Sequence, residues 1–153
     1  MGGARRQEDS SVIDFGAWPV VLVRIGPSTS VPGLAAALSR LEAKLELPAS
    51  IALVIDARGD LGALRDGDPV ALRLRLDALR ERLEGSVRFE GAVFDDPEAE
   101  RFYHALRWLY PRPWPARRCP SVREALVQAR AHLSERPSFG ASPRRGPPTD
   151  PEA

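Results

Sequence analysis

Apolar residues gather in three short runs along the chain, at residues 18–25, 51–56 and 87–94. The first two runs are nearly continuous and rich in valine or isoleucine, which indicates strands buried on both faces of a sheet. The third run, interrupted by Arg88 and Glu90, predicts another strand. A shorter run at 12–15 alternates between apolar and polar residues and is broken by Gly16. It therefore predicts a hairpin partner for the first long strand. A final strand fits residues 116–119.

Between these runs, apolar residues recur three and four positions apart, which is the pattern of helices with one apolar face. Residues typical of helix N-caps precede each pattern: Ser30, Asp68, Asp96 and Ser121, the first three followed by proline and the last by Glu124 in a capping box. The residues predicted to face the core are Leu34, Leu38, Leu41 and Leu45; Leu72, Leu76, Leu79 and Leu83; Ala99, Phe102, Tyr103, Leu106, Leu109 and Tyr110; and Val122, Ala125, Leu126, Ala129 and Leu133.

One segment is ambiguous, because Leu72 to Leu76 also alternates as a strand would. The helical period continues through Leu83 and the cap at Asp68 is a good one, so we predict a helix. The segment from Ala57 to Gly67, which contains three glycines, is expected to be a loop.

The predicted order of elements is β-β-α-β-α-β-α-β-α. Strands that alternate with helices indicate a largely parallel sheet joined by right-handed crossovers, and the leading hairpin makes the sheet mixed. We therefore predict one α/β domain over residues 11–134, with a mixed, mostly parallel sheet and about four helices. Residues 1–10 and 135–153 are polar or rich in proline and bury too little apolar surface to offset ordering, so we expect disordered tails.

Charge and composition argue against several functions. The chain has 22 Lys and Arg against 21 Asp and Glu, for a net charge of +1, and the two signs are interleaved. A nucleic-acid partner is therefore not expected, because such binders usually carry a basic excess on one face. The sequence has neither a signal-like apolar run nor one long enough to span a membrane, so we expect a cytoplasmic protein.

Sequence motifs for catalysis and metal binding are also missing. Cys119 is the single cysteine, which excludes an intramolecular disulfide and a multi-cysteine metal site. His104 and His132 each lack a second ligand four residues away, and no GxSxG motif is present. The glycines after residue 56 match no phosphate-binding loop. We predict no catalytic residue, no metal site and no cofactor.

A polar site is possible where the second long strand ends. Asp56 lies at its carboxyl end, which in open α/β sheets is the usual edge for ligands. Arg58, Asp60 and Asp66 follow in the glycine-containing loop and complete the candidate crevice. The alternative is that Asp56 accepts hydrogen bonds from loop amides and has only a structural role.

A second candidate surface lies on the third helix. Trp108 falls nearly opposite the apolar stripe of this helix, on the same side as Arg101, His104 and Arg107. An exposed tryptophan among arginines has the composition of a binding hot spot. The alternative is that Trp108 is covered by the proline-rich segment at 111–115 or by Trp114.

Four segments, together with the order of elements, give the chain a resemblance to the STAS domains of bacteria. They are Trp18-Pro19 at the first long strand, Ile51 to Asp56, Ala105 to Leu109 before the prolines, and Cys119 to Leu126. The likeness covers residues 12–133 and is closest to divergent bacterial STAS-like domains, which are related to anti-sigma-factor antagonists and grouped with CRAL-TRIO-like lipid-transfer modules.

The resemblance implies a regulatory domain that binds other proteins. In switching STAS domains, a Ser or Thr at the start of the second helix accepts a phosphate. This sequence has no Ser, Thr or Tyr from residue 51 to residue 85, so we expect no phosphorylation switch there. Asp66 or Asp68 can supply a constant negative charge at that helix instead. A plain N-cap role explains Asp68 without any such function, and this is the interpretation we favour.

These observations predict a non-catalytic regulatory or scaffolding domain that binds another protein or a second copy of itself. The alternative is a carrier of a small hydrophobic ligand or lipid, by analogy with the lipid-transfer relatives.

Overall fold

The fold was analysed in a computed structural model, which describes residues 12–47, 49–59, 61–109 and 112–135. Within these ranges the side chains of Arg65, Pro69, Leu106, Trp108 and Leu109 are not described. The two predicted tails lie outside the described residues, apart from Glu135.

The predicted α/β class is confirmed, with one helix more than expected. In chain order the elements are β1 (Ile13–Asp14), β2 (Val20–Arg24), α1 (Val31–Lys44), β3 (Ile51–Asp56), α2 (Gly62–Arg65), α3 (Pro69–Ser86), β4 (Val87–Val93), α4 (Pro97–Leu109), β5 (Ala116–Arg118) and α5 (Val122–Ser134). The additional element, α2, lies inside the segment predicted to be a loop. It forms where Leu61 and Leu64 turn inward and become buried.

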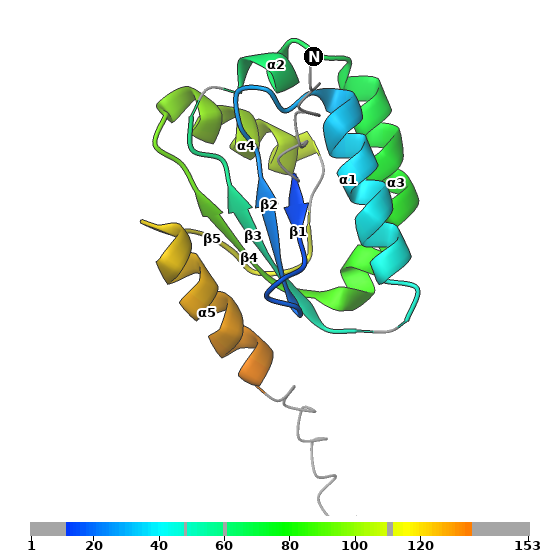
Figure 1. The fold of residues 1–153 in the computed structure, drawn as a ribbon, viewed down its shortest axis with the longest axis vertical. Helices are drawn as coiled ribbons and strands as arrows, with labels where there is room; N and C mark the ends of the chain where they lie inside the picture. The colour runs from blue at the N-terminus through cyan, green and yellow to red at the C-terminus, as the bar shows by residue number, and fades with distance from the viewer. Residues whose placement is uncertain (1–11, 48, 60, 110–111, 136–153) are drawn as a thin grey trace, which may run out of the picture.

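The five strands form one sheet in the order β1-β2-β3-β4-β5. β1 pairs with β2 in antiparallel fashion, whereas β2, β3, β4 and β5 are parallel to their neighbours. The hairpin and the mixed sheet are therefore as predicted. Because each parallel strand lies next to the one before it, the carboxyl ends of β2, β3 and β4 meet at a single edge, the upper edge of the sheet in Figure 1.

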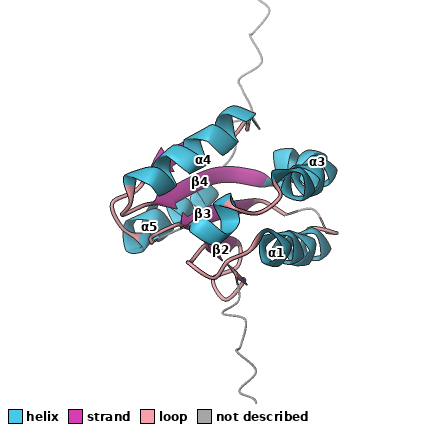
Figure 2. Ribbon diagram, turned by 90° about the horizontal axis from the view of Figure 1, so that it is seen from above, coloured by secondary structure: helices cyan, strands magenta, loops and turns pink. Residues whose placement is uncertain are grey.

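Helices cover both faces of the sheet, and each face has its own apolar core. Helices α1, α3 and α4 contribute to the larger core on one face, together with strand residues such as Val21, Leu53 and Ile55. Helix α5 packs on the other face, where Ala125 and Ala129 are fully buried. Figure 2 shows α1 and α3 on one side of the strands and α5 on the opposite side.

The close packing of α5 depends on a glycine in the middle of β4. A Cβ atom on Gly91 would lie 3.1 Å from Phe89 Cε1, 3.2 Å from Ala125 Cβ and 3.3 Å from Cys119 Sγ. These separations are shorter than ordinary van der Waals contacts, so a side chain at this position would push the helix away from the sheet.

The predicted helix starts and core stripes are largely confirmed. Ser30, Asp68 and Ser121 each accept a backbone hydrogen bond at the N-terminus of their helix. Leu34, Leu41 and Leu45 of the first stripe are buried. The other described members of the four stripes are either buried or partly buried against a core: Leu38, Leu72, Leu76, Leu79, Leu83, Ala99, Phe102, Tyr103, Val122, Ala125, Leu126, Ala129 and Leu133.

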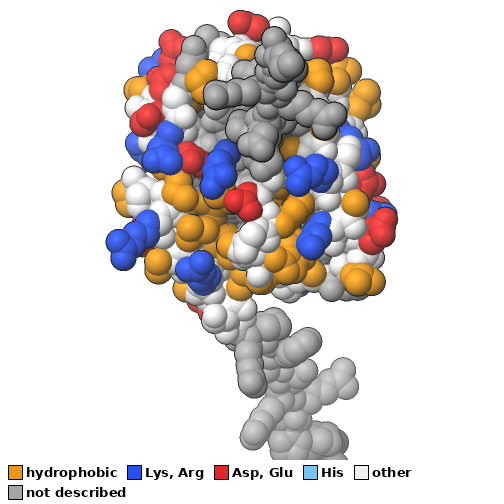
Figure 3. All heavy atoms as spheres, viewed as in Figure 1, with side chains coloured by type: hydrophobic (Ala, Val, Ile, Leu, Met, Phe, Trp, Pro, Cys, Tyr) orange, Lys and Arg blue, Asp and Glu red, His pale blue; other side chains and the backbone are white. Residues whose placement is uncertain are grey.

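The hairpin edge of the sheet carries two half-buried aromatic side chains, Phe15 and Trp18, which pack against the larger core. Lys44 Nζ lies 5.1 Å from the ring centroid of Trp18 and 5.7 Å from that of Phe15, and the Arg40 guanidinium is 5.7 Å from Phe15. These cation–π contacts attach α1 to the hairpin. In the same view as Figure 1, hydrophobic side chains gather on this face among several Lys and Arg side chains (Figure 3).

Candidate functional site

A hollow of about 360 Å³ lies at the carboxyl ends of β2, β3 and β4. Three segments supply its walls: the end of β2 with the turn that leads to α1, the end of β3 with the residues that follow it, and Asp95 after β4. The lining residues are Arg24, Ile25, Gly26, Pro27, Ser28, Thr29, Asp56, Arg58 and Asp95. The hollow is therefore at the edge where open α/β sheets usually bind ligands.

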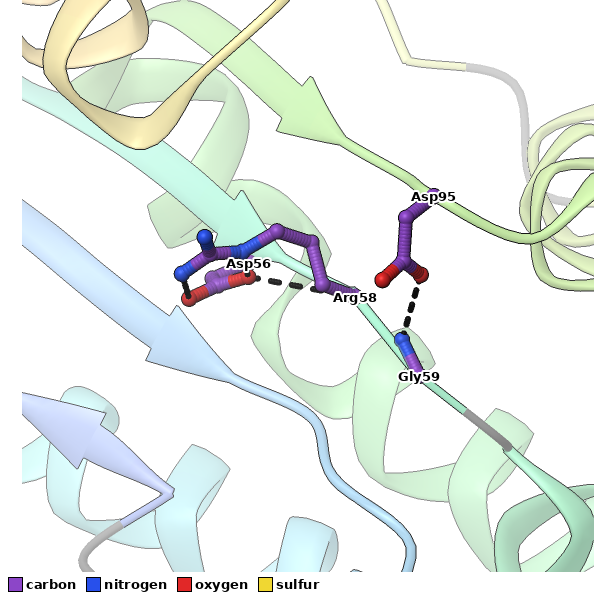
Figure 4. A network of polar contacts seen from close by, with 4 residues as sticks. All are labelled: Asp56, Arg58, Gly59 and Asp95. Carbon is purple, nitrogen blue, oxygen red and sulfur yellow. Dashed lines mark hydrogen bonds and ion pairs between the residues drawn. The ribbon is translucent and has the colours of Figure 1, made fainter.

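At the centre of this edge, Asp56 and Arg58 form a two-pronged ion pair. Arg58 Nε donates to Asp56 Oδ1 at 2.8 Å, and Arg58 Nη2 donates to Asp56 Oδ2 at 2.9 Å (Figure 4). The Asp56 side chain is only 14% exposed, whereas that of Arg58 is 53% exposed. Hydrogen bonding from Arg58 lowers the pKa of Asp56 despite partial burial of the carboxyl group. The carboxylate is thus firmly ionised, with both oxygens engaged.

Asp95 holds the segment after β3 from the neighbouring strand. Its Oδ1 accepts a hydrogen bond of 2.6 Å from the backbone N–H of Gly59, 36 residues away in sequence (Figure 4). Gly59 has a φ of 109°, a conformation that favours glycine because a Cβ atom is disfavoured there. This contact joins the chain that leaves β3 to the chain that leaves β4.

On the other side of the hollow, the turn between β2 and α1 is fixed by its own hydroxyl groups. The Gly26 N–H donates to Thr29 Oγ1 at 2.9 Å, and the Thr29 N–H donates to the Gly26 carbonyl at 3.0 Å. Ser30 Oγ accepts from the Gly33 N–H as the helix cap. Ser28 is different, because it is exposed and forms no hydrogen bond within the described ranges.

Charges of alternating sign follow this edge from strand to strand, in a row formed by Arg24, Asp56, Arg58 and Asp95. Asp14, which lies opposite Leu22 on β1, pairs with Arg24 from beside this edge. Arg24 Nη1 lies 3.7 Å from Asp14 Oδ2. Arg24 is also paired in register with Asp56, whose pKa its charge helps to lower. The negative charge of Asp95 also contributes, after that of Asp56, to raising the pKa of Arg58. The row gives the edge a fixed electrostatic pattern rather than one dominant sign.

The structure brings together part of the crevice expected from sequence. Asp56 and Arg58 lie side by side, and Asp56 also accepts a weak 3.4 Å hydrogen bond from the Arg58 amide, as the structural alternative predicted. Asp66 is exposed at the C-terminus of α2 and is not among the lining residues. Asp60 lies outside the described residues. Asp95 was not among the candidate residues. Asp96, the predicted cap, accepts from the Glu98 N–H, and its neighbour Asp95 lines the hollow.

The second candidate surface, on α4, is described only in part. Arg101 and His104 are exposed, as expected from the helical spacing, and the His104 side chain is 60% exposed. Arg107 is half-buried. The side chain of Trp108 lies outside what the structure describes, so its exposure stays a prediction. Trp114, named above as one possible cover for Trp108, is itself buried in the larger core.

A buried polar cluster behind α4 was not anticipated from sequence. Glu90, in the middle of β4, has a side chain that is only 1% exposed. It accepts hydrogen bonds from the Tyr103 hydroxyl of α4 and from Arg112, in the segment before β5. Burial, together with the Glu90 carboxylate, raises the pKa of Tyr103 well above its ordinary value. The only sequence signal was a glutamate in the middle of a strand whose other polar side chain, Arg88, lies near its start.

The remaining groups with reactive potential offer little chemistry. Cys119 is buried, and burial raises the pKa of its thiol, which keeps it in the unreactive form. His132 stacks on Phe89 with its Nδ1 2.9 Å from the Gln128 carbonyl oxygen. The described part of the chain holds no group of three or more His, Cys, Asp or Glu side chains that could bind a metal ion. No helix in these ranges combines the length and apolarity needed to cross a membrane.

The fold and the hollow together define an α/β domain with a mixed five-stranded sheet and charged side chains at the carboxyl ends of its parallel strands. Comparison of the chain with protein-family models, with curated proteins and with solved structures gave no match.

Proposed function

We propose that this chain is a non-catalytic regulatory or scaffolding domain that binds another protein through the hollow at the carboxyl ends of β2, β3 and β4. The observation that carries the proposal is the row of alternating charges along this edge. Such a row discriminates between partners, because each charge favours the opposite sign and penalises the same sign across an interface.

The pairing within the row supports recognition rather than catalysis. A general base needs a pKa near the working pH and a free oxygen directed at the proton it removes. Asp56 has a lowered pKa and both of its oxygens are engaged by Arg58. The nine lining residues include neither histidine nor cysteine.

The chemistry of the edge also bears on the kind of partner. Carboxylates alternate with guanidinium groups, so a nucleic acid, with one phosphate per nucleotide, would meet repulsion along the row. A protein surface can present charges of both signs. The charged lining gives little support to the alternative, a carrier of small hydrophobic ligands, because apolar ligands favour apolar pockets. The STAS-like family relationship and the cytoplasmic location are part of the proposal.

The test is affinity capture from native lysate with the full chain and two matched variants. Ser28→Trp places a bulky side chain in the hollow at an exposed position, and Ser39→Trp places the same bulk at an exposed position of α1 away from it. A protein that binds the wild type and Ser39→Trp, but not Ser28→Trp, supports the proposal. If the partner is a second copy of the chain, sedimentation velocity shows the same difference as a loss of the dimer.

A third variant distinguishes the two candidate surfaces. If Trp108→Ala loses the partner while Ser28→Trp keeps it, the binding surface is on α4 and the hollow is not used. If neither the wild type nor any of the three variants captures a specific protein, the proposed binding function itself is wrong.

A further inference from the structure

We propose that the hollow is built to accept a single carboxylate, supplied by an Asp or Glu side chain of the partner protein and held between Arg24 and Arg58. This inference rests on the proposed function, because it names the group by which the partner is recognised. It is drawn from an imbalance between hydrogen-bond donors and acceptors among the lining residues.

The donors of the hollow are only partly used. Arg58 donates Nε–H and one Nη2–H to Asp56, which leaves the other N–H groups of its guanidinium without an acceptor in the described ranges. Arg24 Nη1 is 3.7 Å from Asp14 Oδ2, too far for a hydrogen bond, and the Arg24 side chain donates to no other residue that the structure describes. The hydroxyl of Ser28 lies in the same wall and is likewise unengaged within these ranges.

The acceptors, in contrast, are largely occupied. Both oxygens of Asp56 accept from Arg58, and its side chain is 14% exposed. One oxygen of Asp95 accepts from Gly59. The side chains of Arg24 and Arg58 are 55% and 53% exposed, so an incoming group meets guanidinium groups before it meets Asp56. The missing component is therefore an acceptor.

The charge balance selects a carboxylate over a phosphate. Arg24 and Arg58 carry two positive charges, and Asp56 and Asp95, the other charged lining residues, carry two negative charges, so the lining as a whole is neutral. A monovalent carboxylate held between Arg24 and Arg58 adds one negative charge beside two guanidinium groups. A phosphate monoester carries close to two negative charges at neutral pH, and the second would lie beside Asp56 and Asp95, where it is repelled.

Direct measurement of the arginine side chains tests this inference without a known partner. Nε–H signals of the full-length chain are followed by NMR while propionate, which matches the end of a glutamate side chain, is added at constant ionic strength. We expect saturable shifts of the Arg24 and Arg58 signals with a Kd of roughly 10 mM, the range of a small fragment. Arg24→Gln and Arg58→Gln should each weaken binding by about fivefold or more. Arg123→Gln, at an exposed position on α5, should leave it unchanged.

Any one of three results would overturn the carboxylate site. These results are the absence of saturation below about 100 mM propionate, equal binding of the neutral isostere propionamide, and tighter binding of inorganic phosphate than of propionate. Arg24→Lys keeps the positive charge but has fewer hydrogen-bond donors, and it replaces Arg24→Gln as the test if the glutamine variant misfolds. The dispersion of the amide NMR signals shows whether each variant is folded. If the site fails while Ser28→Trp still abolishes partner capture, the proposed protein-binding function stands and only the carboxylate chemistry is wrong.

Discussion

Replacing Arg112 by methionine removes the positive partner of the most deeply buried carboxylate described in the protein. Glu90 has a side chain that is 1% exposed, and its two oxygens accept from Arg112 and from the Tyr103 hydroxyl. Without Arg112, a buried negative charge keeps one neutral hydrogen bond. Breaking a buried pair in this way costs about 3–5 kcal/mol. We therefore expect the Arg112→Met chain to lose about that much free energy of unfolding, a large share of the ~5–15 kcal/mol of a typical domain.

A second variant distinguishes loss of the ion pair from loss of packing. In Glu90→Leu/Tyr103→Phe/Arg112→Met, all three polar groups are removed together, so neither a charge nor a hydroxyl is left unpaired. Apolar replacement of a complete buried cluster is often close to neutral. The triple variant should therefore be within about 1–2 kcal/mol of the wild type, more stable than Arg112→Met although it carries more changes.

Urea unfolding followed by circular dichroism measures each free energy, with the slope checked for two-state behaviour. Arg123→Met on the exposed face of α5 is the matched control and should change stability by less than about 0.5 kcal/mol. A loss below about 1 kcal/mol for Arg112→Met would refute the reasoning, because Glu90 would then not depend on its cationic partner.

Three further predictions concern other parts of the fold. The carboxyl pKa of Asp56, measured by NMR, should lie below the ordinary value and rise in Arg58→Gln. The lowered pKa stabilises the fold fully above the unfolded value of about 3.9, and this stabilisation is lost as the pH falls through the lower folded value. Arg58→Gln should therefore lose more stability at pH 7 than at pH 3, and equal losses would contradict the ion pair. Gly91→Val should lower the free energy of unfolding by about 1–3 kcal/mol, measured by chemical denaturation, because the added side chain forces α5 away from the sheet. An unchanged denaturation midpoint would mean that α5 shifts without loss of stability. Trp108→Ala should change stability by less than about 1 kcal/mol and weaken partner binding, measured by calorimetry, by about 2 kcal/mol or more; a folding loss of roughly 3 kcal/mol with unchanged binding would make Trp108 a core residue.

The parts of the fold that could be predicted from sequence are those fixed by near neighbours in the chain. The caps at Ser30, Asp68 and Ser121 bond to amides two or three residues away, so the local sequence contains both partners. The leucine stripes are equally local, because helical geometry alone places them on one face. Glycine content, in contrast, misled the prediction for Gly62–Arg65, where burial of Leu61 and Leu64 favours a short helix.

The contacts that could not be predicted join residues distant in sequence. Asp95 and Gly59 meet only because β3 and β4 are neighbours and end at the same edge. A run of two aspartates before proline suits capping, and nothing local shows that the first one is free for another role. Glu90 is a similar case, because its partners Tyr103 and Arg112 come from a helix and a connection that return to the strand only after folding.

The order of the strands in the sheet has a consequence for how this protein folds while it is being synthesised on the ribosome. Each new strand from β2 to β5 pairs beside the strand made just before it, so the larger core can grow one unit at a time as the chain emerges. The opposite face has no such gradual route. Val20, Leu22, Val54 and Phe89 are covered only when α5, the last described element, has been synthesised. A nascent chain halted before Val122 would therefore display an apolar sheet face to the cell, and it is at this stage that a holdase chaperone would find its strongest binding site.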